Sequence, residues 1–312
     1  MSEVTGLQRL LSVLDLAPHP PERPAELPPA PGRPAEVLFV GDSVPTPFGG
    51  RIYGGQVLAQ ALLACGRTVD PDRLPHSMHA YFLREGKKKL PIEFAVENLR
   101  DGGSFSSRRT LALQSGKAIL AATASFQLDQ PGYDAQIPMP RDVPPPETLV
   151  SARELVKDYD IPSLQWWGRD SAFDIVPVSP SILLGPDPAP SSRQMVWVRS
   201  RAPIGPPPDA SVSEQLWHRA LLAFVCDQFL LEPAVRGAGK SWADVVSGIP
   251  MASLDHAMWW HRDFRFDEWL LFVQEAGTAS GGRTLGQARV YTRNGALAAS
   301  IAQEGLMRMP AA

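Results

Sequence analysis

The sequence predicts an α+β fold made of two copies of one unit, each a helix packed on a curved antiparallel sheet. The first observation is the distribution of proline, which makes up 32 of the 312 residues. Ten prolines lie within 18–47, sixteen within 131–208 and six elsewhere. Because proline lacks an N–H and has a fixed φ, such stretches suit neither helix interiors nor central strands. Two folding segments remain, at about 50–130 and 209–309.

The second observation is the order of patterns in the first folding segment. Gly54 and Gly55 open a helical run of small and apolar residues that ends near Cys65. Four strand patterns follow in hairpin succession, with Gly-containing turns between them. These patterns cover residues 76–83, 92–99, 105–114 and 118–127. We expect one helix and four antiparallel strands.

The third observation is that the second folding segment repeats this order. A helical run over 217–231 precedes strand patterns at 252–262, 268–280, 283–292 and 296–308. Short motifs also recur about 180 residues apart, as in His76-Ser77-Met78 and His256-Ala257-Met258. This period is too long for a solenoid and indicates a duplicated domain. Each copy leaves an edge strand that must be covered, so we expect the two sheets to join edge to edge.

The remaining segments complete the domain plan. Leu7, Leu10, Leu11 and Leu14 have helical spacing, and we expect this short helix to pack on the protein rather than anchor it to a membrane. The Pro-rich stretch 17–35 is expected to be an extended spacer, with an SH3-type ligand as the alternative. The predicted divisions are 1–35 for the helix and spacer, 36–130 for the first domain, 131–170 for a Pro-rich linker and 171–309 for the second domain. Runs at 172–178 and 193–200 are expected to open the second domain as strands.

Composition excludes several classes of function. The net charge of −3 gives no basic excess for nucleic acid or an acidic membrane surface. Two cysteines, Cys65 and Cys226, cannot form a disulfide framework or a zinc site, so no metal or cofactor is expected. No signal peptide and no apolar run of membrane-spanning length are recognisable. We therefore expect a soluble cytoplasmic protein.

Several longer motifs, in matching order, resemble acyl-CoA thioesterase II, the TesB family. They are Tyr53–Val57, His76–Arg84, Leu99–Gly102 with Ser104–Ser106, Asp255–Trp259, Glu268–Leu271, and Gln303–Gly305 with Met307 and Arg308. The resemblance covers nearly all of the chain except 17–35 and parts of 131–170. It implies a double hotdog fold, in which two tandem repeats each wrap a sheet around a long helix. It also implies an enzyme that hydrolyses acyl-CoA to a free acid and CoA and that forms a homo-oligomer, either a dimer or a tetramer.

The same resemblance implies three catalytic residues, Asp227, Ser253 and Gln303, which would hold the attacking water. Taken without the family, Asp227 shares a small apolar helix face, where a carboxylate is costly to bury unless it is paired or used; an exposed or helix-terminal aspartate is the alternative. Gln303 lies on the apolar side of its strand, where it is either functional or a satisfied core glutamine. Ser253 gives no signal alone, and the family usually has threonine there.

Other candidates have two interpretations each. The N–H groups of Gly54 and Gly55 could bind a thioester oxygen, or the glycines could allow close helix–sheet packing. Arg108 could contact the phosphates of coenzyme A, or it could be a solvated residue on a strand face. His76 and His256 occupy matching positions, which favours a structural role. Adjacent Asp255 and His256 point to opposite faces of a strand and cannot pair.

The first repeat has no carboxylate at the level of Asp227, which predicts one water-activating site per chain. No Ser–His or Cys–His nucleophile pair is evident, so we expect no covalent intermediate. The main alternative function is a hotdog protein that binds acyl-CoA or an acyl carrier without hydrolysing it. A hydratase or dehydratase on the same fold is a further alternative.

Overall fold

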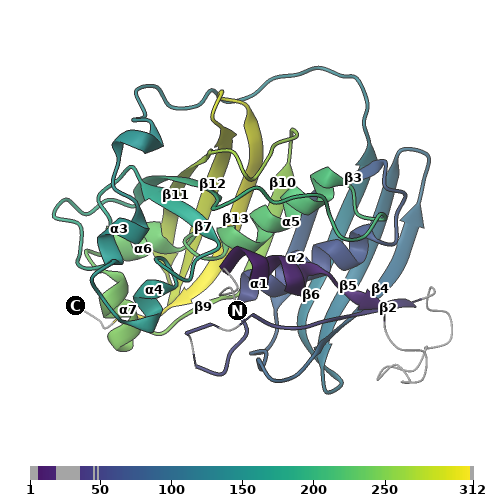
Figure 1. The fold of residues 1–312 in the computed structure, drawn as a ribbon, viewed down its shortest axis with the longest axis horizontal. Helices are drawn as coiled ribbons and strands as arrows, with labels where there is room; N and C mark the ends of the chain where they lie inside the picture. Colours follow the sequence, from purple (N-terminus) through teal and green to yellow (C-terminus); the bar gives the residue numbers. More distant parts are fainter. Residues whose placement is uncertain (1–5, 19–35, 45, 48, 310–312) are drawn as a thin grey trace.

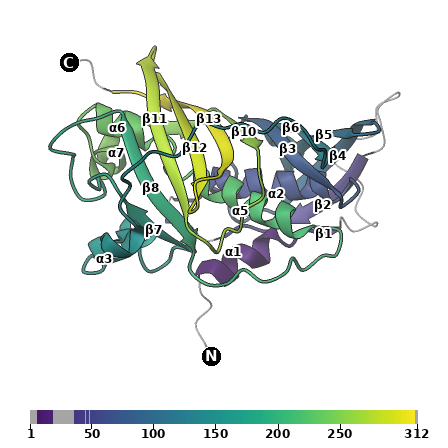
Figure 2. The ribbon, with the colours of Figure 1, turned by 90° about the horizontal axis from the view of Figure 1, so that it is seen from above.

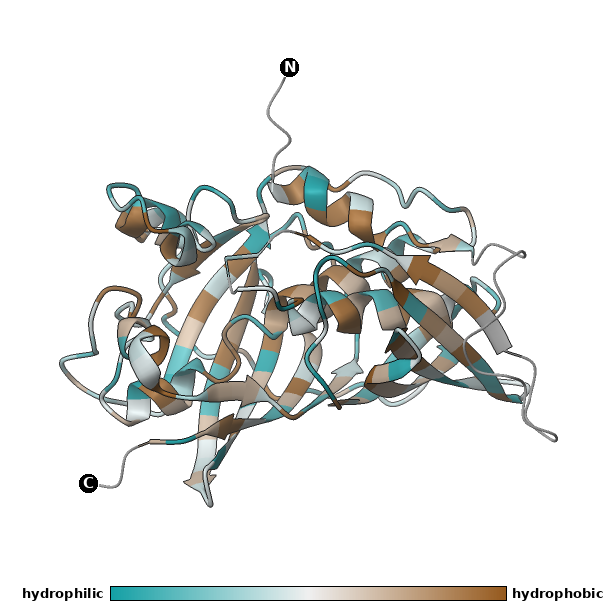
Figure 3. Cartoon of the chain, turned by 90° about the horizontal axis from the view of Figure 1, so that it is seen from below, coloured by the Kyte–Doolittle hydropathy of each residue, from teal (hydrophilic) through white to brown (hydrophobic). Residues whose placement is uncertain are grey.

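Two apolar helices, α2 (Gly54–Gly66) and α5 (Glu214–Cys226), lie at the centre of the fold. The computed structural model describes residues 6–18, 36–44, 46–47 and 49–309. Nearly every residue of both helices is buried, as expected for helices that are apolar on all sides. The two helices pack against each other inside a curved sheet (Figure 1). Figure 3 shows hydrophobic and hydrophilic residues alternating along the strands around these helices.

The sheet has 13 strands, and every pairing in it is antiparallel. Its first part has the order β1-β2-β4-β5-β6-β3 and its second part the order β10-β13-β12-β11-β8-β7, with β9 paired to β13. The strands of the first part are β1 (Ala17–Pro18), β2 (Glu36–Gly41), β3 (Arg73–Phe82), β4 (Ile92–Asp101), β5 (Phe105–Gln114) and β6 (Lys117–Leu128). The strands of the second part are β7 (Phe173–Pro177), β8 (Arg193–Ser200), β9 (Met251–Ser253), β10 (Asp255–Trp260), β11 (Leu270–Ser280), β12 (Arg283–Thr292) and β13 (Leu297–Met307).

The two parts join through β3 and β10, where Met78 lies opposite Met258. The edge-to-edge junction is therefore confirmed (Figure 2). The strand orders on either side of the junction mirror each other, as a duplication requires. The strands expected at 172–178 and 193–200 are β7 and β8, at the far edge of the second part.

The N-terminal helix α1 (Gly6–Leu14) buries Leu7, Leu10 and Leu14 against the main core. Packing on the protein is thus the interpretation that the structure supports. The expected spacer at 17–35 falls outside the described residues, apart from the short strand β1. In the part of the chain that the structure describes, no helix has the length and hydrophobicity needed to cross a membrane.

Four short helices gather at the end of the molecule formed by the second repeat (left in Figure 1). The linker contributes α3 (Ala152–Val156) and α4 (Pro162–Gln165), together with the 3-10 turn η1 (Pro146–Thr148). The other two are α6 (Glu232–Gly237) and α7 (Trp242–Gly248). None of these was predicted, because each is too short to show helical periodicity.

Two expected elements differ from the structure. The helix expected over 217–231 begins earlier, at Glu214, and ends at Cys226, with Asp227 as its C-cap. Pro233 opens α6 and would clash with the carbonyl of Phe229 in a continuous helix, so the chain must turn before it. The strand expected over 252–262 is divided at Leu254 into β9 and β10, which pair with β13 on different stretches.

Candidate active site

Asp227 lies where the end of α5 meets the beginning of α2. Its Oδ2 accepts a hydrogen bond from the backbone N–H of Gly55 at 2.9 Å. Its Oδ1 accepts hydrogen bonds from Ser253 Oγ and from Gln303 Nε2, both at 2.9 Å. The carboxylate therefore has three donors from three elements, which compensates its removal from water.

Ser253 and Gln303 also bond to each other, with 2.6 Å between Gln303 Nε2 and Ser253 Oγ. Gln303 is fully buried, on the side of β13 that faces the helices, as its strand pattern predicts. Ser253 reaches the same place because β9 pairs with β13, with Ser253 opposite Gly305. The structure thus brings all three predicted catalytic side chains together.

A second layer of buried groups lies behind Gln303. His256 Nδ1 is 2.8 Å from Gln303 Oε1, and His256 Nε2 is 3.2 Å from Cys226 Sγ. Since both amide hydrogens of Gln303 go to Asp227 and Ser253, Oε1 must accept, and we assign the imidazole proton to Nδ1. Nε2 then accepts from the thiol of Cys226. The hydrogen bonds run in one direction, from Cys226 through His256 and Gln303 to Asp227.

Both groups of this layer are held neutral. Burial lowers the pKa of His256, while burial and the nearby charge of Asp227 raise the pKa of the Cys226 thiol. A buried thiol of raised pKa is inert rather than nucleophilic. The Cys226–His256 contact was not foreseen, but it does not change the expectation of a mechanism without a covalent intermediate.

The two glycines at the start of α2 bring the repeats into contact. A Cβ on Gly55 would overlap the carbonyl oxygen of Phe224, and one on Gly54 would lie 2.8 Å from Asp227 Oδ2. The close-packing interpretation therefore holds. The N–H of Gly55 donates to the Asp227 carboxylate, so in this structure it is not directed to a substrate oxygen.

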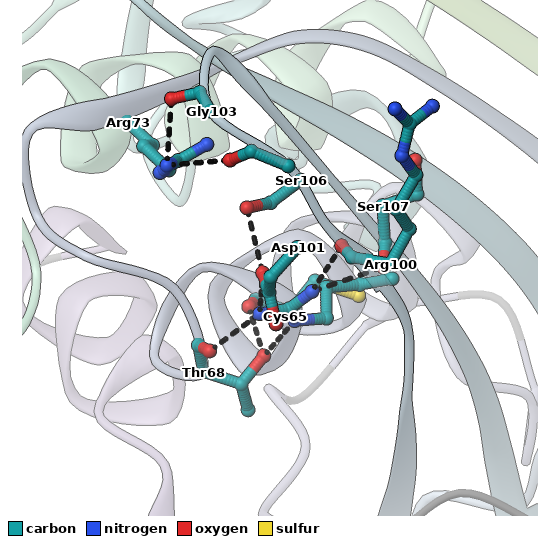
Figure 4. A network of polar contacts seen from close by, with 10 residues as sticks. Cys65, Thr68, Arg73, Arg100, Asp101, Gly103, Ser106 and Ser107 are labelled. Carbon is teal, nitrogen blue, oxygen red and sulfur yellow. Dashed lines mark hydrogen bonds and ion pairs between the residues drawn. The ribbon is translucent and has the colours of Figure 1, made fainter.

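Arg108 does not lie at this site. Its side chain is 2% exposed, and its guanidinium donates to Thr68, to Asp101 and to the backbone carbonyls of Arg100 and Ser107. Figure 4 shows this network around the end of α2. The structure therefore contradicts the expected role of Arg108 in binding CoA phosphates. This face of β5 packs on α2 rather than facing solvent.

Two cavities meet at Asp227. The first, of about 480 Å³, is mainly apolar and lies between the linker and α7. Among its lining residues are Leu164, Trp166, Trp167, Leu183 and Trp242. The second, of about 680 Å³, extends from Asp227 past Ser253 to the exposed Arg51. Asp227 thus lies between the apolar chamber and the wider cavity, and Arg51 lies at one side of the wider cavity. In the described residues, no cluster of histidine, cysteine or acidic side chains is suited to a metal ion.

Comparisons with known proteins identify the family of the two repeats. Residues 43–127 match the family model of the acyl-CoA thioesterase N-terminal domain, and residues 142–307 match that of the C-terminal domain. Mouse acyl-coenzyme A thioesterase 8 is 37% identical over 285 residues, which span 88% of this chain and 85% of the relative.

Two solved structures give the same result for the fold. An acyl-CoA thioesterase II, TesB2, from Mycobacterium marinum is 35% identical, with a TM-score of 0.72 over 97% of this chain and 98% of the other. A hot dog protein from Alicyclobacillus acidocaldarius has a TM-score of 0.69 over 97% of this chain and 98% of the other at 20% identity, which supports the fold alone. With both domain models matched in order across a double hotdog, this chain belongs to the acyl-CoA thioesterase II (TesB) family.

Proposed function

We propose that this acyl-CoA thioesterase hydrolyses its substrate with a water molecule held by Asp227, Ser253 and Gln303. The observation that carries the proposal is that Ser253 and Gln303 both donate to Asp227, which lines both cavities. A water beside Asp227 can donate to the carboxylate, and it can accept from the Ser253 hydroxyl or the Gln303 amide when that group exchanges its present bond to Asp227 for the water. Asp227 takes the proton while the water oxygen attacks the thioester carbonyl carbon.

The tetrahedral intermediate then expels CoA as a thiolate, with cleavage of the C–S bond. Because a free thiol has a pKa of about 8.5, this leaving group departs without a strong general acid. The proton held by Asp227 can pass to the thiolate or to solvent. One base and two positioning side chains are therefore chemically sufficient.

We assign the two cavities to the two parts of the substrate. The apolar chamber has the size and the aromatic lining typical of small-molecule sites, which suits an acyl chain. The wider cavity leads to Arg51, whose side chain is 62% exposed and forms an ion pair with Glu85 at 2.8 Å. Arg51 would meet the anionic part of CoA by exchanging this exposed partner. The thioester would then lie beside Asp227, where the cavities meet.

The test of the mechanism is Asp227→Asn. This variant keeps the shape of the side chain but removes the base, so kcat for decanoyl-CoA should fall by about 10²–10⁴-fold. A thiol-release assay measures the rate, and Asp255→Asn is the matched control. Asp255 also lies on the second repeat, but its carboxylate accepts a hydrogen bond from the backbone N–H of Glu304 instead.

The outcomes separate hydrolysis from binding. Full activity in Asp227→Asn would refute the water mechanism. Tight binding of decanoyl-CoA by the unaltered protein, with no thiol released, would favour the binding-only alternative. The fold alone does not distinguish these activities.

We further propose a homo-oligomer that works in the cytoplasm. Tyr81 and Trp259 are 62% and 38% exposed on the outer face of β3 and β10, and Trp259 packs edge-on against His79. Such aromatic groups on a sheet face favour association. Free, buried Cys65 and Cys226 suit a reducing compartment. A monomeric mass by light scattering at micromolar concentration would contradict the oligomer.

A further inference from the structure

Gln228 directly follows Asp227 in the chain. Its side chain is buried, and its amide includes a donor with no partner in the part of the chain that the structure describes. Its side chain is 8% exposed, and its Nε2 has no hydrogen-bond partner within the described residues. A buried donor without a partner destabilises the folded protein, so it calls for an explanation. Nothing in the sequence pattern singled out this glutamine.

Three cavities meet at this side chain. Gln228 lines the apolar chamber and the wider cavity described above. It also lines a third cavity, of about 320 Å³, beneath α1 and the linker. No other described residue lines all three. The amide therefore lies where the acyl chain, the thioester and the CoA arm would join.

Hydrolysis of a thioester needs a donor for the negative charge that develops on the carbonyl oxygen. The groups around Asp227 are already committed: the N–H of Gly55 and the hydroxyl of Ser253 donate to its carboxylate. Gln303 divides its two amide hydrogens between Asp227 and Ser253. Among the described residues, by contrast, no acceptor pairs with the hydrogens on Gln228 Nε2.

We propose that Gln228 is a catalytic residue whose Nε2 donates to the thioester carbonyl oxygen and stabilises the oxyanion. The proposal rests on the water mechanism above and adds the group that mechanism lacks. The terminal torsion of a glutamine is soft, so the amide can turn toward a bound carbonyl without movement of the backbone. Asp227 and Gln228 would then act on the same carbonyl group, one through the water and the other through the oxygen.

The test is Gln228→Met, which keeps the length of the side chain and removes the donor. We expect kcat for decanoyl-CoA to fall by about 10²-fold, the usual order for the loss of one oxyanion donor. Gln215→Met is the matched control, because Gln215 lies on α5 and its amide bonds only to the backbone of Phe264. Should Gln228→Met fail to fold, Gln228→Leu also removes the donor and has a smaller, uncharged side chain.

Two non-hydrolysable probes separate the carbonyl from the rest of CoA. S-(2-oxodecyl)-CoA carries a carbonyl near the sulfur, and S-decyl-CoA carries none. Gln228→Met should weaken binding of the first probe by about tenfold or more and leave binding of the second unchanged. Equal weakening of both probes would place Gln228 on the CoA arm, and kcat within twofold of the unaltered enzyme would also overturn the proposal. Failure of the water mechanism shows separately, in Asp227→Asn, which retains Gln228.

Discussion

His256 shows how a residue that does not touch the substrate can set the geometry of one that does. Its Nδ1–H fixes the end of the Gln303 amide that accepts, and this leaves Nε2 of Gln303 for Asp227 and Ser253. A flipped amide would direct its oxygen at the carboxylate, where two acceptors repel. His256 is thus a positioning residue for the water site.

His256→Ala should lower kcat by about tenfold with little change in KM, because it frees the Gln303 amide to rotate but removes no substrate contact. His256→Asn should recover part of the loss, since its amide nitrogen can donate from near the place of Nδ1. Steady-state kinetics on decanoyl-CoA measures both variants. A merely structural role would be indicated if the two variants lost equal activity in proportion to their loss of thermal stability.

At the residue scale, the apolar patterns singled out Asp227 and Gln303 but left a structural alternative open for each, and their expected roles came from the family resemblance. Ser253 depended on family resemblance. The roles of Gln228, His256 and Cys226 could not be predicted. The contacts of His256 join it to Cys226 on α5 and Gln303 on β13, 30 and 47 positions away. The third cavity at Gln228 is also lined by the distant Leu10, and sequence spacing carries no information on such contacts.

At the scale of elements, the linker is the segment whose role in the structure differs most from its predicted role. Its proline content predicted a connection between domains, and its helix α4 instead forms a wall of the apolar cavity. Pro162 occupies the first turn of α4, where its missing N–H costs nothing, so proline begins this helix rather than preventing it. Leu164, half-buried on α4, lines the cavity.

Leu164→Trp should therefore shorten the acyl chain that the enzyme accepts. The larger ring fills part of the chamber, and the ratio of kcat/KM for palmitoyl-CoA to that for hexanoyl-CoA should fall about tenfold or more, as when methylenes lose their place in a pocket. Leu164→Ala should shift the ratio the opposite way. Val150→Trp, at an exposed linker position outside the cavity, is the control. An unchanged ratio in Leu164→Trp would place the acyl chain elsewhere.

At the scale of the whole molecule, the proposed active site draws on two unequal repeats. The central helices and most strands of both repeats could be predicted from helical periodicity and alternation, although β1 and β2 were not, and the junction could be predicted from the need to cover an edge. The duplication did not reveal which residues of the site come from which repeat. The second repeat supplies Asp227, Ser253 and Gln303, while the first supplies the N–H of Gly55 and the close approach of α2 to α5.

Gly55→Ala tests this coupling, because a methyl group there would overlap the backbone oxygen of Phe224. Forcing α2 from α5 should cost roughly 1–3 kcal/mol of stability. It should also weaken the Gly55–Asp227 bond, so activity should fall even at temperatures where the variant is folded. Gly66→Ala, which meets only the side chain of Leu216, should lower Tm with activity retained, and Gly103→Ala, in open space, should change neither. If Gly55→Ala lowered Tm but retained activity, as expected for Gly66→Ala, the first repeat would support the fold without contributing to the site.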